Sequence, residues 1–151
     1  MFNIKFKHLH VRNTTIKNIH SGGGTVQSMP ICEVVPQFDH VLVEHTPDAK
    51  NYIYTFTQDD FSVACIQDFE IKEDYQRRSY GTQIINTLLT KYKYIMISNR
   101  GFAITWWKRF GHVHCDTQIG RKVISLLYTA FKNDEDMLYT LDNCYTILTL
   151  H

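Results

Sequence analysis

The sequence predicts an α+β (α/β) fold with a mixed, mostly antiparallel central sheet and flanking helices. Runs of β-branched and aromatic residues at 40–45, 52–57 and 61–71 are separated by short polar turns, which is typical of an antiparallel meander. An apolar stripe with helical spacing covers 80–92, and a short apolar run at 94–98 follows it. A helical crossover of this length makes the strands before and after it parallel neighbours.

The remaining segments are assigned from their composition and spacing. Alternating apolar and polar residues predict a first strand at 2–6, and three glycines predict a loop at 21–24. The segment 119–131 has the apolar spacing of a helix, although its composition also suits a strand. The other expected elements are a helix at 101–110, a strand at 112–115 and a closing strand at 144–150.

The strand expected at 61–71 is not a regular alternation. Val63 and Cys65, then Phe69 and Ile71, keep a period of two, but residues 66–68 shift the phase between them. One extra residue in a strand is what a β-bulge introduces, and bulges often lie beside active sites. An irregular edge strand is the alternative explanation.

Composition restricts the classes of function. The chain has 151 residues, a hydrophobic share of 44% and a net charge of +1, which together predict one globular domain over residues 1–151 with no nucleic-acid or membrane partner. The sequence lacks an apolar run of about 20 residues, and its amino terminus alternates where a signal peptide would be continuously apolar. Four widely spaced cysteines predict reduced thiols and a cytoplasmic location, with Cys65 as a small buried hydrophobe.

The stretch EDYQRRSYGTQIINTLL at 73–89 combines a basic turn with the start of a helix. The first N–H groups of a helix have no partner within the helix and attract anions. Gly81 lets a ligand approach the backbone closely, and Arg77 and Arg78 add positive charge beside it. The stretch therefore indicates a phosphate or pyrophosphate site, and a solvated loop is the alternative. Neither the P-loop nor the dinucleotide-binding pattern of glycines is present.

Two segments of this region carry a family resemblance. The run IKEDYQRRSYGT at 71–82 resembles the acyl-CoA-binding signature of the GNAT superfamily of N-acetyltransferases, with Gln76 in its first place, Gly81 in its last, and Ser79 where a glycine is usual. The run AITWWKRFG at 103–111 resembles the second conserved segment of that superfamily. The stretch from 66 to 112 is also distantly similar to eukaryotic glucosamine-phosphate N-acetyltransferases.

The resemblance implies a GNAT-like sheet with a splayed pair of parallel strands, into which acetyl-CoA is bound as co-substrate. It implies that backbone groups of Phe69 and Ile71 pair with the pantetheine arm, and that the expected bulge opens the gap for the thioester. The residues that it assigns to the cofactor are Phe69, Ile71, Gln76, Arg77, Arg78, Ser79, Tyr80, Gly81, Thr82, Asn99 and Trp107.

The chemistry requires a base for the attacking amine. Asp68 and Glu70 are the candidates. A tyrosine often protonates the leaving thiolate in this family, but Trp107 occupies that place, and an indole N–H is not an acid near neutral pH. Tyr54 or Tyr139 is a possible replacement.

His112 and His114 would share one face of a strand, where they suit a base or a surface role better than a metal site. No metal is therefore expected.

The leading hypothesis is an acetyl-CoA-dependent N-acetyltransferase acting on a small amine, an amino sugar such as glucosamine 6-phosphate, or a protein amine, with a possible homodimer. A sugar phosphate would need a second group of cations, for which Arg109, Arg121 and Lys122 are available. The first alternative is a catalytically degenerate GNAT-fold protein that binds CoA or a partner. The second is an unrelated α/β domain with a phosphate-binding turn.

Overall fold

A single mixed sheet forms the centre of the protein. The computed structural model describes residues 16–17, 24–46, 50–66, 68–98, 104–114, 116–132 and 145–149. Within these ranges the strand order is β1-β2-β3-β4-β5-β7-β6; β4 and β5 run parallel, and every other neighbouring pair is antiparallel. The strands are β1 (Ile16–Lys17), β2 (Thr25–Pro30), β3 (Tyr52–Gln58), β4 (Phe61–Ile66), β5 (Tyr94–Ser98), β6 (Gly111–His114) and β7 (Tyr145–Thr149).

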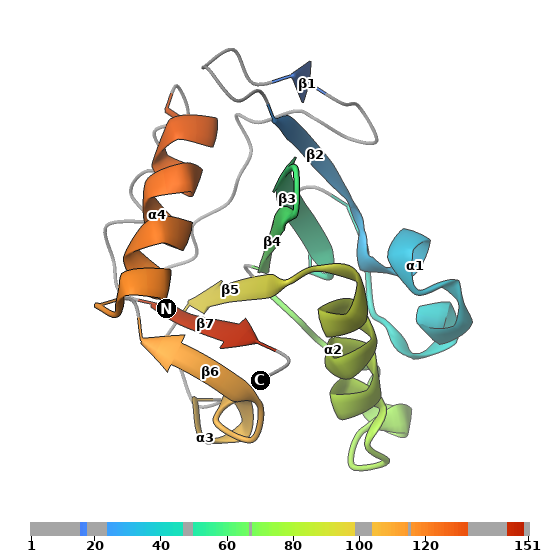
Figure 1. Cartoon of the computed structure of the whole chain (residues 1–151). Coiled ribbons are helices and arrows are strands. Elements are labelled where there is room, and N and C mark those ends of the chain that lie inside the picture. Colours follow the sequence, from blue (N-terminus) through green and yellow to red (C-terminus); the bar gives the residue numbers. More distant parts are fainter. Residues whose placement is uncertain are drawn as a thin grey trace.

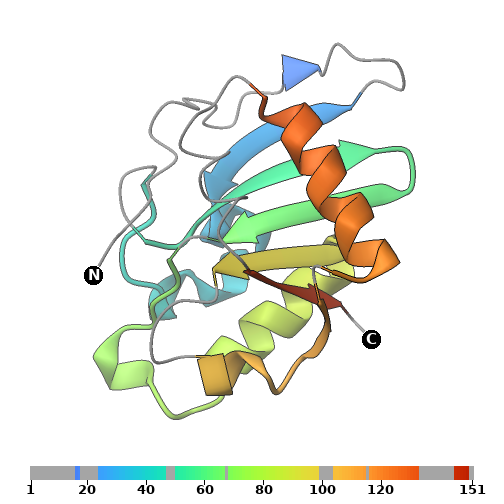
Figure 2. The same cartoon turned by 90° about the vertical axis from the view of Figure 1, so that its left-hand side faces the viewer.

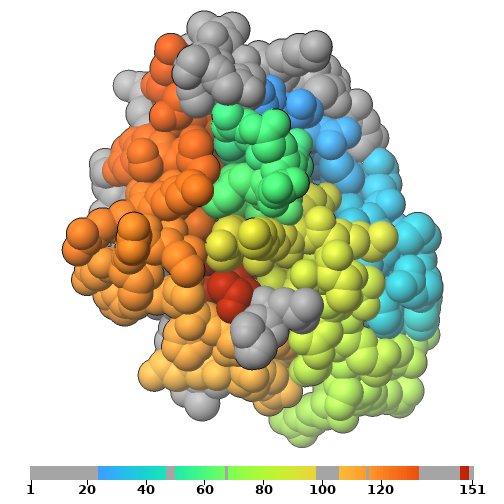
Figure 3. Space-filling view, viewed as in Figure 1, coloured from blue at the N-terminus to red at the C-terminus, as the bar shows by residue number. Residues whose placement is uncertain are grey.

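Helices cover both faces of this sheet (Figures 1 and 2). Figure 2 shows α4 lying across the strands, with α1 and α2 on the far side, and in the space-filling view α4 and α2 flank the central strands (Figure 3). The helices are α1 (Ile31–Val34), α2 (Tyr80–Lys91), α3 (Ile104–Trp107) and α4 (Gln118–Ala130), with 3₁₀ helices η1 (Pro36–Val41) and η2 (Glu73–Tyr75).

Strand alternation divides the core into two clusters. Val63 and Cys65 of β4 pack under α4, whereas Ala64 and Ile66 pack against the α1, η1 and α2 side. Each side chain of this alternating set is at most 4% exposed, so β4 is buried on both faces. Burial also raises the pKa of the Cys65 thiol, as expected for a cysteine that behaves as a small core hydrophobe.

Several expected elements are confirmed. The strand at 52–57 is β3, the apolar stripe at 80–92 is α2, and the run at 94–98 is β5, which pairs with β4 in parallel as the crossover required. The segment 119–131 is the helix α4, and its alternative as a strand is wrong. Strands β6 and β7 lie within the expected 112–115 and 144–150 to within one residue.

The strand expected at 40–45 is wrong. That segment begins in η1, which Pro36 starts, and then makes an isolated antiparallel bridge at Leu42. Val41 and Leu42 lie three and four residues after Phe38 and all three are buried, so a helical turn satisfies their burial better than a strand. The first strand of the meander is instead β2, which pairs with β3.

Two other expected elements are shorter in the structure. The strand at 61–71 ends at Ile66, and the helix at 101–110 is reduced to α3 within the described residues. The β-bulge expected at 66–68 is centred on Gln67, which lies outside those residues. The flanks on either side keep one register, because β3 pairs Ile53 with Ile66 and Asn51 donates its N–H to the Asp68 carbonyl. Both strands therefore advance by two residues, and the prediction of an extra residue is wrong. The strand at 2–6 and most of the loop at 21–24 also lie outside the described residues.

One buried polar residue joins the sheet to the segment after β4. Asn51 is 0% exposed and has the left-handed φ of 65°. Its backbone accepts from the Ile31 N–H at 2.8 Å and donates to the Asp68 carbonyl at 3.1 Å. Its side chain donates to the Glu70 carbonyl and accepts from the Glu70 N–H, both at 2.9 Å. Asn51 therefore connects α1 and residues 68–70 through four hydrogen bonds.

No described helix is both long and apolar enough to cross a membrane.

Replacing Asn51 tests this connection. Asn51→Ala removes the side-chain hydrogen bonds to both backbone groups of Glu70. It also leaves an alanine at positive φ, where no side-chain hydrogen bond offsets the steric cost of its Cβ. We therefore expect a loss of about 2–4 kcal/mol in the free energy of unfolding. Asn51→Gly accepts the backbone angle and should lose about 1 kcal/mol less. Urea denaturation measures both values, and equal stability of the wild type and Asn51→Ala would contradict this role.

Candidate functional site

A cleft of about 570 Å³ lies where β4 and β5 end and α2 begins. This volume is in the range of small-molecule and cofactor sites. Three segments form its walls: residues 68–72, which we call the strap, the turn from η2 into α2, and α3 with the turn that follows it. The lining residues are Phe69, Glu70, Ile71, Tyr75, Gln76, Arg77, Ser79, Tyr80, Gly81, Thr82, Trp106, Trp107 and Arg109.

The strap is extended and is bonded along one edge. The Asp68 carbonyl and both backbone groups of Glu70 bond to Asn51, and the Lys72 N–H donates to the Val41 carbonyl at 2.8 Å. Backbone groups of successive residues in an extended chain point to opposite edges. The N–H and carbonyl of Phe69 and the N–H of Ile71 accordingly have no backbone hydrogen-bond partner among the described residues. These groups form a second edge of the strap, on which the Ile71 carbonyl is already bonded to the Gln76 side chain.

The turn into α2 brings backbone N–H groups to the cleft. Arg77 and Ser79 both adopt the left-handed conformation, with φ of 62° and 66°. Ser79 is the N-cap of α2, and within the described part of the chain no side chain caps this first turn. The N–H groups of Tyr80, Gly81 and Thr82 therefore lack helical acceptors and suit an anion. Ser79 occupies a conformation that glycine adopts more easily.

Gln76 fastens the base of this turn. Its side-chain Nε2 donates to the Ile71 carbonyl at 2.9 Å, so the amide links the end of the strap to the start of the helix. The first position of the resembled signature thus has a local structural role in this chain.

Aromatic rings form the opposite wall. A Cβ on Gly81 would lie 3.0 Å from Cζ2 of Trp106, so the glycine makes room for the indole. Phe69 stacks on Trp106 with ring centroids 6.3 Å apart, and Trp107 packs edge-on against Trp106 at 4.8 Å. Trp107 is 9% exposed, which agrees with packing and not with proton transfer.

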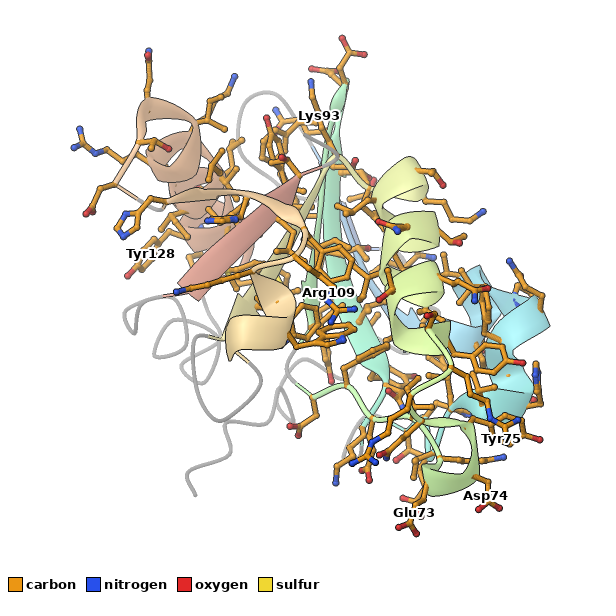
Figure 4. All side chains as sticks on the ribbon, turned by 90° about the horizontal axis from the view of Figure 1, so that it is seen from below. Glu73, Asp74, Tyr75, Lys93, Arg109 and Tyr128 are labelled. Carbon is orange, nitrogen blue, oxygen red and sulfur yellow. The ribbon has the colours of Figure 1, made fainter. Side chains whose placement is uncertain are left out.

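The cations of the region are divided between different surfaces. Arg77 lines the cleft, whereas Arg78 lies over the Tyr75 ring and does not line it. Figure 4 shows Arg109 between α3 and α2, where its Nη1 donates to Thr82 Oγ1 at 3.0 Å. The turn into α2 therefore has two cations from separate segments, Arg77 and Arg109. Arg121 and Lys122 are exposed on α4 and do not line this cleft.

The two candidate bases differ in position. Glu70 lines the cleft, and its Oε1 lies 3.3 Å from Nζ of Lys50 in a half-exposed ion pair. Asp68 is partly buried but is not among the cleft-lining residues.

Of the two possible replacement acids, Tyr54 does not line the described part of the cleft. It is 2% exposed in the core beneath α4. Tyr139 and Asn99 lie outside the described residues. His112 and His114 are exposed on β6, where Nδ1 of His114 lies 3.4 Å from the Asp116 carboxylate.

Three cleft-lining residues were not among those assigned to the cofactor or to the base from sequence: Tyr75, Trp106, and Arg109, which was offered for a separate sugar-phosphate site. Tyr75 packs its ring against Tyr80 at 5.9 Å, and Trp106 faces Gly81 across the cleft. The adjacent tryptophans in the resembled segment were the available signal for Trp106.

No protein-family model matches this sequence, and no curated protein matches it significantly.

The left-handed Ser79 gives a stability test of the turn. Ser79→Gly removes the Cβ that is strained at positive φ, so we expect the free energy of unfolding to rise by up to about 1 kcal/mol. Arg78→Gly, at a neighbour without positive φ, should instead lower it by about 0.4–1 kcal/mol because the unfolded chain gains freedom. Chemical denaturation compares the two, and a fall of equal size in both variants would contradict the strained turn.

Proposed function

We propose that the protein is an acetyl-CoA-dependent N-acetyltransferase of GNAT-like fold, which transfers an acetyl group to a primary amine. The observation that carries the proposal is the cleft, in which a partly free strap edge and an uncapped helix start meet at the end of a parallel strand pair. Beyond Ile66 the chain bonds to 41–43 and Asn51 instead of continuing its pairing with β5. This supports a separation of the two parallel strands at this end. A splayed pair of this kind is what the family resemblance implies.

The turn into α2 supplies the pyrophosphate site. The N–H groups of Tyr80, Gly81 and Thr82 bind phosphate oxygens, and Arg77 and Arg109 balance the negative charge. Arg109 acts while hydrogen-bonded to Thr82, so its guanidinium is already oriented before the ligand enters.

The strap supplies the pantetheine site. An extended ligand with amide groups can add to a free strand edge through main-chain hydrogen bonds. Phe69 and Ile71 provide the backbone groups, and the rings of Phe69 and Trp106 provide an apolar wall for the chain between the amides.

Glu70 is the base that the geometry favours, because it lines the cleft and Asp68 does not. The amine nitrogen attacks the thioester carbonyl carbon, the carbon–sulfur bond breaks, and the amine proton passes to Glu70 directly or through water. Lys50 leaves the Glu70 carboxylate for this step, and their half-exposed ion pair is weak enough to allow it. No side-chain acid is assigned to the thiolate.

A degenerate protein that binds CoA or a partner without catalysis is the second candidate. The buried Trp107 in the usual acid place and the pairing of Glu70 with Lys50 favour it. CoA binding without thiol release from acetyl-CoA, across a panel of primary amines, would select this candidate.

The cofactor site is tested by charge placed in the turn. Gly81→Glu directs a carboxylate at the pyrophosphate position and displaces Trp106, so we expect at least a 100-fold loss of CoA affinity by calorimetry. Gln83→Glu adds the same charge to an exposed position on α2 that does not line the cleft, and it should change the affinity less than about threefold. Far-ultraviolet circular dichroism checks folding of both. Wild-type affinity in Gly81→Glu would rule out this site.

The base is tested by isosteric amides. Glu70→Gln should lower kcat by about 10²–10⁴-fold without a change in CoA affinity, because the amide cannot accept the amine proton. Asp68→Asn is the matched control and should retain kcat within about threefold. Steady-state thiol release measures both, and the reverse order of effects would assign the base to Asp68.

A further inference from the structure

A second group of reactive side chains lies near α1, apart from the cleft. Cys32 belongs to α1, Asp39 to η1, and His45 follows the bridge at Leu42. One ligand atom from each, a thiol sulfur, a carboxylate oxygen and a ring nitrogen, lie within 4.8 Å of one another. Nε2 of His45 is 2.9 Å from Oδ1 of Asp39. These three side chains therefore converge on one small volume.

The backbone that carries these side chains is held by the core. Val35, Val41 and Leu42 are at most 1% exposed, and they separate the three ligands along the chain. The Val35 N–H donates to the Ile31 carbonyl at 3.0 Å, and the Leu42 N–H donates to the Asp39 carbonyl at 3.3 Å. Because these contacts fix α1 and η1, the thiol and the carboxylate are positioned without help from a ligand.

We propose that Cys32, Asp39 and His45 bind one zinc-class divalent cation, with water in the fourth position. Sulfur, imidazole nitrogen and carboxylate oxygen are the donors that Zn²⁺ takes in proteins, and three protein donors leave one tetrahedral position open. A thiolate and a carboxylate together neutralise the two charges of the ion. To reach the roughly 3.3–3.6 Å spacing of ligands on one tetrahedral ion, Nε2 and Oδ1 must separate by a few tenths of an ångström from 2.9 Å. An atom pair near the 4.8 Å limit must close by about 1 Å through side-chain rotation.

A nucleophilic cysteine is a poorer interpretation of the same cluster. An activated thiol is usually paired with an imidazole, but here Nε2 of His45 lies 2.9 Å from Oδ1 of Asp39. On metal binding the Cys32 S–H bond breaks, its electron pair forms the sulfur–metal bond, and the proton passes to solvent. The hydrogen bond between His45 and Asp39 also breaks, and the imidazole binds the metal through Nε2 as the tautomer that carries its proton on Nδ1.

The experiment is a Co²⁺ titration of the metal-stripped full chain, because Co²⁺ reports thiolate and tetrahedral ligation in its absorption spectrum. We expect one equivalent to give a thiolate-to-metal charge-transfer band that Zn²⁺ then removes. Cys32→Ser should abolish the band, and His45→Ala should weaken Co²⁺ binding by at least about 100-fold, since loss of even an outer-shell partner costs about 10–100-fold.

His114→Ala is the matched control, because it removes an exposed histidine that also faces an aspartate but belongs to no described group of three ligands. It should leave the titration unchanged. No charge-transfer band in the wild type would overturn the proposal, as would a band retained in Cys32→Ser. A band lost in His114→Ala and kept in His45→Ala would also overturn it. Because Cys32→Ser is nearly isosteric, retained circular dichroism separates a lost ligand from a lost fold.

Discussion

The hydrogen bonds of Asn51 are the constraint on which the cleft depends. A buried side chain at positive φ binds both backbone groups of Glu70, while its own backbone bonds to Asp68 and Ile31. Asparagine suits this position because its short amide tolerates the left-handed region and offers both a donor and an acceptor. The chain after β4 is thereby held near α1 and 41–43, and on its other edge the Phe69 backbone and the Ile71 N–H have no backbone partner among the described residues.

This edge and the start of α2 are two consequences of one chain path. Gln76 links the end of the strap to the turn, and the left-handed Arg77 and Ser79 reverse the chain so that α2 starts beside the strap. Because Gly81 has no Cβ, the Trp106 ring can pack against it and form the opposite wall of the cleft. A peptide-like edge, an anion-attracting helix start and an apolar wall thus adjoin in one cleft. Those three features match the chemistry of a long ligand that carries amides at one end and phosphates at the other.

The parts of this arrangement that depend on local pattern were predictable from sequence. The helical spacing of Ile84, Ile85 and Leu88 identified α2, and the buried run of β5 followed from its composition. The strand predicted at 40–45 is wrong because the β-branched residues of HVLVEH suit a strand locally, whereas the burial of Phe38 and Val41 together favours a 3₁₀ turn. Contacts between distant segments left no local signal: the Arg109–Thr82 bond joins residues 27 apart, and the Cys32, Asp39 and His45 spacing fits no short metal motif.

We propose that acyl-CoA binds along the strap edge and at the start of α2, and amide hydrogen exchange resolved by residue, with and without saturating CoA, can test this. We expect slower exchange at Phe69 and Ile71 together with Tyr80, Gly81 and Thr82, because these N–H groups lack partners among the described residues and gain them from the ligand. Unchanged exchange at these amides under saturating CoA, with protection elsewhere or none, would contradict it.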